Sequence, residues 1–221
     1  MARRALTRIK INEQPDFSRF YRPLEEVPKP LALAGLFGRT APLELEIGSG
    51  KGLFLRTAAQ KNPAHDFLGV EIGKKYAIFS AAGIAKANLT NAMMICGDAA
   101  AFLDEWVLPN SLHAVHVYFP DPWWKRAHKK RRILREEVVQ LIERNLLPGG
   151  TLYFRTDVKE YFETTLKLLA RATRLEGPHD IPENEPQHDM DYHTHFERRT
   201  RLHGEEVYRA LFVKPVTKKE Q

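Results

Sequence analysis

Leu43-Glu44-Leu45-Glu46-Ile47-Gly48-Ser49-Gly50-Lys51-Gly52 is the stretch from which the fold of this 221-residue chain can be read. Its first half alternates apolar and acidic residues, which is the period-2 pattern of a β-strand with one buried face. A glycine-rich turn follows, and residues 52–60 then show helical spacing. A strand, a tight turn and a helix in immediate succession predict the opening βα unit of a parallel sheet.

The alternation of strands and helices continues outward from this stretch. Further strands are predicted at 66–71, 92–96, 112–119 and 151–156, and helices at 74–86, 98–106, 132–147 and 158–171. This order predicts an α/β fold with a mostly parallel, twisted sheet, right-handed crossovers and helices on both faces. The last alternating run, residues 206–213, is expected to join the sheet as an antiparallel strand.

Composition indicates one globular domain of a cytoplasmic protein. Hydrophobic residues make up 43% of the chain and charged residues 28%, which is a globular balance. Cys96 is the single cysteine, so an intramolecular disulfide and a cysteine-built metal cluster are excluded, and we expect it to be buried. No apolar run reaches bilayer length, and the basic N-terminus lacks the apolar stretch of a secretory signal. We expect no membrane partner.

Charge is unevenly distributed along the chain, although the net charge of +6 is modest. Residues 125–135 are rich in lysine and arginine and contain no acid, and the first ten residues are also basic. Such segments favour a polyanionic partner, while a solvated helix face is the alternative for Arg131, Arg132 and Arg135. Residues 1–40 contain several prolines and are predicted to form a basic N-terminal arm, with residues 41–221 as the folded domain.

Acidic residues stand at the ends of three successive predicted strands: Glu46, Glu71 and Asp98. Because parallel strands end at the same edge of a sheet, these carboxylates should surround one pocket beside Gly48 and Gly50. The glycine spacing fits neither the dinucleotide fingerprint nor the P-loop. A cationic ligand with ribose and adenine but no phosphate fits best, which points to S-adenosylmethionine. A helix N-cap is the alternative for Asp98.

A second motif follows the strand at 112–119 and reads Phe119-Pro120-Asp121-Pro122-Trp123-Trp124-Lys125-Arg126-Ala127-His128-Lys129-Lys130-Arg131-Arg132. It resembles the hallmark of the bacterial tRNA (guanine-N7)-methyltransferases, Pro-Asp-Pro-Trp running into Lys-x-x-His-x-Lys-Arg-Arg. The glycine turn at 46–52, Thr156-Asp157 and Thr194-His195-Phe196-Glu197 also match that family. The resemblance begins at about Leu43 and leaves residues 1–40 unmatched.

This resemblance implies a single-domain, Rossmann-like class I methyltransferase that transfers methyl from S-adenosylmethionine to N7 of a guanine in the tRNA variable loop. It implies that Asp121 is catalytic and also lines the cofactor site with Glu46, Gly48, Gly50, Glu71 and Asp98. The residues implied to hold the substrate base are Lys125, Asp157, Thr194, His195, Phe196 and Glu197. Those implied to contact RNA are Ala127, His128, Lys129, Lys130, Arg131 and Arg132.

Several alternatives stay open from the residues alone. Asp157 could cap the helix at 158–171 rather than bind the base, and Trp123 or Trp124 could plug the sheet edge rather than stack on a base. The histidines and acids of residues 179–195 lack metal-ligand spacing, so no metal is predicted. Competing functions are a non-catalytic RNA-binding protein on a methyltransferase scaffold and a nicotinamide oxidoreductase, which the glycine spacing disfavours. Both a monomer and a homodimer are compatible with the sequence.

Overall fold

The structure is a computed structural model that describes residues 17–31, 33–123, 132–181, 197 and 203–216. Its strands are β1 (Tyr21–Pro23), β2 (Leu43–Ile47), β3 (Asp66–Glu71), β4 (Ala92–Cys96), β5 (Leu112–Tyr118), β6 (Leu146–Thr156), β7 (Glu176–His179) and β8 (Tyr208–Val213). Its helices are α1 (Leu33–Phe37), α2 (Leu53–Lys61), α3 (Lys74–Lys86), α4 (Ala99–Ala101), α5 (Glu136–Asn145) and α6 (Lys159–Ala172). The 3₁₀ turns η2 (Phe17–Arg19) and η3 (Leu24–Glu26) and the π-helical turn η4 (Phe102–Trp106) complete the elements.

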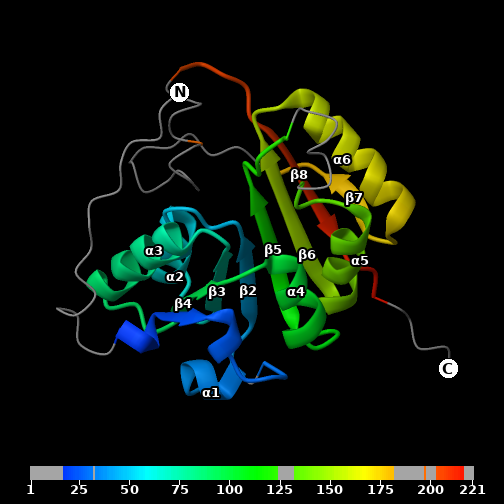
Figure 1. The fold of residues 1–221 in the computed structure, drawn as a ribbon. Coiled ribbons are helices and arrows are strands. Elements are labelled where there is room, and N and C mark those ends of the chain that lie inside the picture. Colours follow the sequence, from blue (N-terminus) through cyan, green and yellow to red (C-terminus); the bar gives the residue numbers. More distant parts are fainter. Residues whose placement is uncertain (1–16, 32, 124–131, 182–196, 198–202, 217–221) are drawn as a thin grey trace, which may run out of the picture.

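The strands form one sheet in the order β1-β4-β3-β2-β5-β6-β8-β7 (Figure 1). Every pairing from β1 to β6 is parallel, and β8 pairs antiparallel with both β6 and β7. The order in which the chain adds strands changes direction at β2, because β3 lies on one side of β2 and β5 lies on the other. Open α/β sheets bind ligands at such a reversal, beyond the carboxyl ends of the strands.

Strand β2 shows why the sheet has two chemically different faces. Leu43, Leu45 and Ile47 are buried and join the larger hydrophobic core. Glu44 and Glu46 alternate with them and therefore point to the opposite face. The strand thus places two carboxyl groups inside the molecule, near the reversal of strand order.

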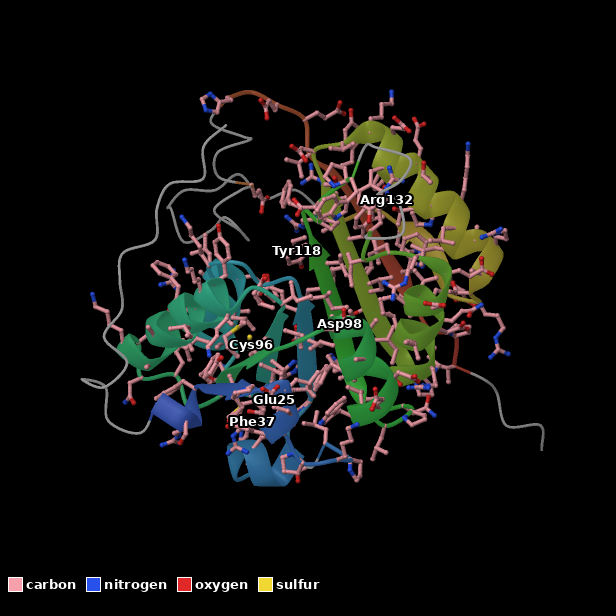
Figure 2. The ribbon with its side chains drawn as sticks, in the orientation of Figure 1. Glu25, Phe37, Cys96, Asp98, Tyr118 and Arg132 are labelled. Carbon is pink, nitrogen blue, oxygen red and sulfur yellow. The ribbon has the colours of Figure 1, made fainter. Side chains whose placement is uncertain are left out.

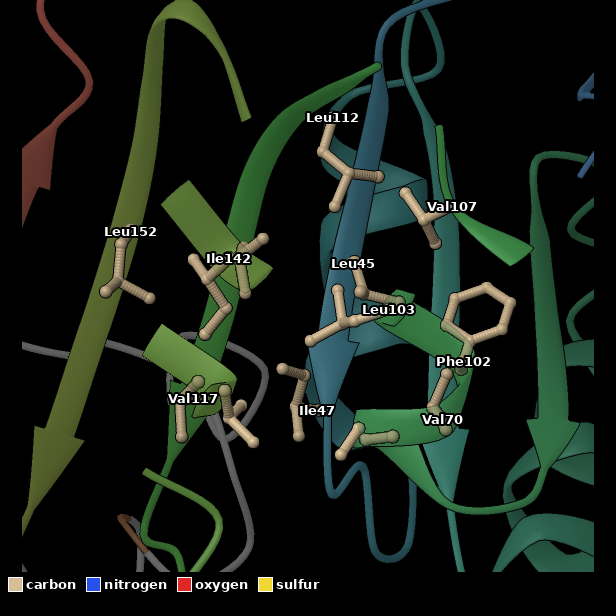
Figure 3. Close-up of a cluster of buried hydrophobic side chains, with 14 of the residues drawn as sticks. Leu45, Ile47, Val70, Phe102, Leu103, Val107, Leu112, Val117, Ile142 and Leu152 are labelled. Atoms are coloured by element: carbon tan, nitrogen blue, oxygen red, sulfur yellow. The ribbon is translucent and has the colours of Figure 1, made fainter. Parts of the chain in front are cut away.

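The larger core lies between the sheet and the layer formed by α4, η4, α5 and α6. Leu45 and Val117 of the sheet pack with Phe102 of η4 and Ile142 of α5, and each of them is fully buried (Figure 3). Burying one such side chain contributes roughly 1.5–3 kcal/mol. A second core packs α2 and α3 against β3 and β4 on the other face, with Phe67 and Met94 at its centre.

The predicted fold is confirmed: the sheet is mostly parallel, helices lie on both faces, and the C-terminal strand β8 is antiparallel. The predicted strands were placed within a few residues, although β6 begins earlier, at Leu146. The predicted helix at 132–147 begins only at Glu136. The segment predicted as a helix at 98–106 is instead the short α4 followed by the π-helical turn η4.

Part of the segment predicted as an N-terminal arm packs against the sheet. Phe20, Leu24, Val27 and Leu31 are buried, and β1 extends the sheet beyond β4. The indole N–H of Trp106 donates to the Val27 carbonyl at 2.9 Å, and the Leu31 N–H donates to the Trp106 carbonyl at 2.8 Å. Residues 20–31 therefore support η4 and the larger core.

In the described part of the chain, no helix is both long and apolar enough to pass through a bilayer.

Candidate functional site

The glycine-rich turn after β2 is held in a backbone conformation that glycine adopts without strain. Gly48, Gly50 and Gly52 have φ angles of +75°, +53° and +67°. The Gly48 N–H donates to the Val70 carbonyl at 2.8 Å, and the Gly52 N–H donates to the Ser49 carbonyl at 2.8 Å. A Cβ on Gly48 would meet nothing within 4 Å, so backbone lies open to the strand ends there.

Replacing Gly52 by alanine should destabilise the protein, because the new Cβ would lie 1.8 Å from the Ser80 Oγ at a φ of +67°. We expect a loss of about 2–4 kcal/mol in the free energy of unfolding, from steric overlap added to left-handed strain. Gly38→Ala is the matched control, since Gly38 has a φ of +70° and nothing within 4 Å of its Cβ position. Equal losses for both variants in urea unfolding would contradict the proposed close packing of the turn.

Glu71, the last residue of β3, binds the backbone of the glycine-rich turn with its carboxylate. Its Oε2 accepts a hydrogen bond from the Gly50 N–H at 3.0 Å, and its Oε1 accepts from the Gly73 N–H at 2.8 Å. Each carboxylate oxygen keeps a lone pair for a further donor. Ile72 beside it is 73% exposed, which is unusual for so large an apolar side chain.

Glu46 is the most unusual carboxyl group at this edge. It is 2% exposed, and its Oε2 has no hydrogen-bond partner in the described part of the chain. Burial, opposed by a hydrogen bond from Ser49 and assisted by the nearby charge of Glu71, raises the pKa of Glu46 to about 8. A buried carboxyl group without a partner is costly, so a cation at this position would remove the cost.

Asp98 acts as the N-cap of α4. Its Oδ1 accepts from the backbone N–H groups of Ala100 and Ala101 at 2.8 and 2.9 Å. The cap considered for Asp98 from the sequence is thus confirmed. A cap uses only part of the acceptor capacity of a carboxylate, so an amine could still donate to the other oxygen. Its place directly after β4 puts it at the same edge as Glu46 and Glu71.

The loop after β5 contains Asp121, and we call its described residues 119–123 the Asp121 loop. Its backbone is strained on both sides of Asp121. Phe119 and Trp123 have φ angles of +50° and +44°, which side chains other than glycine rarely adopt. Such residues cost roughly 1–3 kcal/mol each and concentrate at functional sites. The Phe119 N–H donates to the Arg155 carbonyl at 2.8 Å, which ties the loop to β6. Asp121 itself is exposed.

Arg132 ends the basic motif and is used inside the protein. It is 8% exposed, and its Nε donates to the Pro122 carbonyl at 2.7 Å. Its guanidinium lies 4.9 Å from the ring centre of Tyr161 on α6. Arg132 therefore binds the loop that contains Asp121 through the backbone carbonyl of Pro122. Burial raises the pKa of Tyr161 to about 12 despite the nearby positive charge of Arg132.

The other residues predicted for the substrate base lie near the end of β6 or outside the described residues. Asp157 does not cap α6, because Val158 occupies the cap position and the Thr156 Oγ1 accepts the Val158 N–H at 3.2 Å. Glu197 is buried and pairs with Arg155. The predicted residues outside the described part of the chain are Lys125, Ala127, His128, Lys129, Lys130, Arg131, Thr194, His195 and Phe196.

A buried polar chain that sequence reasoning missed runs beneath the site. The Glu44 carboxylate bonds the His65 Nδ1 at 2.6 Å and the His116 Nε2 at 2.7 Å, and the His116 Nδ1 bonds the Tyr118 hydroxyl at 2.8 Å. Burial alone would raise the pKa of Glu44, but the two histidines lower it below its ordinary value. The two acids of β2 thus differ, because only Glu44 has protein partners for both oxygens.

Comparison with known proteins shows which proteins this chain is similar to. A family model described as "Putative methyltransferase" matches residues 40–210. A tRNA (guanine-N(7)-)-methyltransferase of Rhodopirellula baltica is 44% identical over 211 residues, which cover 93% of this chain and 78% of that protein. One from Myxococcus xanthus is 37% identical over 81% of this chain and 86% of its own length.

A solved structure extends the comparison to the fold. The 16S rRNA methyltransferase KamB has a TM-score of 0.61 at 17% sequence identity, covering 82% of this chain and 92% of its own. At this identity the likeness supports the arrangement of sheet and helices. The Gly48–Gly52 turn, Glu46, Glu71 and the loop after β5 all follow or end strands at the carboxyl edge of this sheet.

Proposed function

The chain belongs to the tRNA (guanine-N(7)-)-methyltransferase family, and we propose that it transfers the methyl group of S-adenosylmethionine to N7 of a guanine in tRNA. From the resemblance of its motifs we place this guanine in the variable loop, and we place the protein in the cytoplasm, where a tRNA substrate would be found. The observation that carries the proposal is the buried Glu46 carboxyl, which has an unpartnered oxygen beside Glu71 at the glycine turn.

The residues at this edge fit S-adenosylmethionine. Glu46 offers a buried carboxyl group that would ionise against the cationic end of the donor, where its unpartnered oxygen would be satisfied. Glu71 is fixed by two backbone N–H groups and can accept hydrogen bonds from the ribose hydroxyls. Asp98 can accept from the exocyclic amine, and the turn at Gly48 has no Cβ in the way. When bound, the donor supplies a methyl group activated by its positively charged sulfur.

Guanine N7 carries a lone pair in the ring plane, so no proton has to leave before it reacts. The task of the protein is to hold N7 in line with the methyl group, and such positioning can contribute roughly 7–11 kcal/mol. The prolines around Asp121 and the strained residues Phe119 and Trp123 restrict the loop. We assign to the Asp121 carboxylate a hydrogen bond from guanine N1 or its exocyclic amine, which stabilises the positive charge that develops on the base.

The direct test is incubation of the protein with undermodified tRNA and S-adenosylmethionine labelled in its methyl group. We expect the label on one guanine, at N7, which can be mapped by chain cleavage at 7-methylguanine. A protein that binds S-adenosylmethionine and tRNA but transfers no label would instead be an RNA-binding protein on a methyltransferase scaffold. A protein that binds no S-adenosylmethionine would contradict the cofactor site itself.

The basic motif is proposed to contact tRNA phosphates, and charge reversal tests this role. Lys129→Glu together with Lys130→Glu should raise the KM for tRNA and reduce its dependence on salt, by about 0.7–0.9 in the logarithmic slope per lost phosphate contact. Lys86→Glu with Lys167→Glu is the control, because it makes the same charge change on exposed positions of α3 and α6. If both double variants behave alike, only net charge matters and the assignment is wrong.

A further inference from the structure

We propose that Arg155 is a positioning residue that holds the Glu197 carboxylate and the start of the Asp121 loop in one arrangement, so that both can engage the guanine. The inference rests on the proposed function, since it concerns the same substrate site. Arg155 belongs to none of the motifs that indicated the site. It is the second-last residue of β6 and lies opposite Tyr118 in the parallel register of β5 and β6.

The backbone of Arg155 anchors the Asp121 loop. Its carbonyl accepts the Phe119 N–H at 2.8 Å, and Phe119 is the first residue of the loop with a left-handed conformation. The guanidinium also lies 5.5 Å from the ring centre of Tyr118, within the range of a cation–π contact. Figure 2 shows Tyr118 at the carboxyl end of β5, directly before this loop. Arg155 thus contacts both Tyr118 and Phe119, the two residues that lead from β5 into the loop.

The side chain of Arg155 fixes a second segment that is remote in the sequence. Its Nη1 lies 3.1 Å from the Glu197 Oε1, and the two residues are 5% and 1% exposed. Glu197 is 42 positions further along the chain and ends the Thr-His-Phe-Glu match. Among residues 182–202 it is the one that the structure describes. The ion pair therefore places Glu197 itself at the end of β6, next to the residue that precedes Thr156-Asp157.

A buried ion pair is a poor means of gaining stability, because desolvation of both charges offsets their attraction. Here the ion pair provides orientation instead, because the planar guanidinium restricts the positions that the Glu197 carboxylate can take. Lysine keeps the charge but not the planar fork or the delocalised contact with the Tyr118 ring. Arg155→Lys should therefore keep the protein folded while it loosens Glu197 and the loop.

The experiment compares Arg155→Lys, Glu197→Gln and the double variant with the parent protein. We expect Arg155→Lys to leave the Tm and the Kd for S-adenosylmethionine nearly unchanged and to lower kcat/KM for tRNA about 10- to 100-fold, as a displacement of about 1 Å would. Because part of the effect of Arg155→Lys passes through Glu197, the loss in the double variant should be smaller than the product of the two single losses. Arg209→Lys is the control, since Arg209 lies opposite Arg155 on β8.

Three results would overturn the inference. One is a kcat/KM for Arg155→Lys equal to that of the parent, and another is a purely additive double variant. The third is a loss that tracks Tm and is equally large for S-adenosylmethionine binding, which marks a structural ion pair. If Arg155→Lys fails to fold, Arg155→Gln is measured by the same criteria, since it retains a donor to Glu197. Parent protein that does not methylate tRNA would overturn the proposed function as well, which separates the two failures.

Discussion

Asp121→Asn should lower the turnover number about 100- to 1000-fold and leave the Kd for S-adenosylmethionine within a few fold of the parent value. The carboxylate stands exposed in a loop restricted by flanking prolines and by left-handed Phe119 and Trp123. Asparagine keeps the size and one acceptor oxygen but removes the negative charge that stabilises the methylated base. The loss should therefore appear in the chemical step rather than in donor binding.

Single-turnover methylation, with the enzyme in excess over tRNA and S-adenosylmethionine saturating, separates this effect from product release. Asp104→Asn is the control, since Asp104 is an exposed acid of η4 whose ion pair with Arg144 lies on the surface. We expect the control to keep the parent rate. A rate for Asp121→Asn within about threefold of the parent, or a parallel loss of donor affinity, would contradict the catalytic assignment.

Glu46→Gln should weaken S-adenosylmethionine binding about 30- to 1000-fold, which corresponds to about 2–4 kcal/mol for the loss of a buried charge partner. The amide preserves the shape of the side chain but cannot balance a cation. The same variant should be more stable than the parent when no donor is bound, because the amide is never charged, whereas the Glu46 carboxylate has to take up a proton when it is buried.

The pH dependence of both effects follows from the direction of the pKa shift. The folded protein raises the pKa of Glu46 to about 8 from an ordinary value of 4.5, so it binds this proton more tightly than the unfolded chain does. The contribution of Glu46 to stability is therefore complete below about 4.5 and declines as the pH rises toward about 8. The stability advantage of Glu46→Gln should grow across the same interval.

Binding of a cationic donor reverses the preference, because it favours the ionised carboxylate. Donor affinity should rise with pH up to about 8, and binding at a pH between 6 and 7 should release close to one proton. Calorimetry in two buffers with different ionisation enthalpies measures this number, and Glu46→Gln should reduce it toward zero. Equal proton release by parent and variant would show that another group titrates.

The sequence predicted the central strands and α3 because their patterns are local and strong. Leu43–Ile47 alternates cleanly, and Lys74–Lys86 has helical spacing between clear ends. Strand β1 was missed because Tyr21–Pro23 is short and ends in proline, so its place is decided by pairing with β4. Strand β7 was missed because Glu176–His179 is exposed and contains Gly-Pro, which normally indicates a turn.

The strand-end acids were predictable for a different reason: in a parallel sheet, consecutive strands bring their carboxyl ends to one edge. The side chains that lie within the sheet could not be predicted as part of the site. Arg155 and His116 look like polar interruptions of apolar strands, and only the register of β5 against β2 and β6 gives them partners. Arg132 stood in a run of positive charge that suggested an RNA contact, whereas its burial against Tyr161 depends on the position of α6.

The most direct measurement is a crystal structure of the protein with S-adenosylmethionine bound. The donor should lie across the carboxyl ends of β2 and β3, with its cationic end against Glu46, its ribose on Glu71 and its methyl group directed toward Asp121. A donor bound elsewhere, or one whose methyl group points away from the Asp121 loop, would contradict the account.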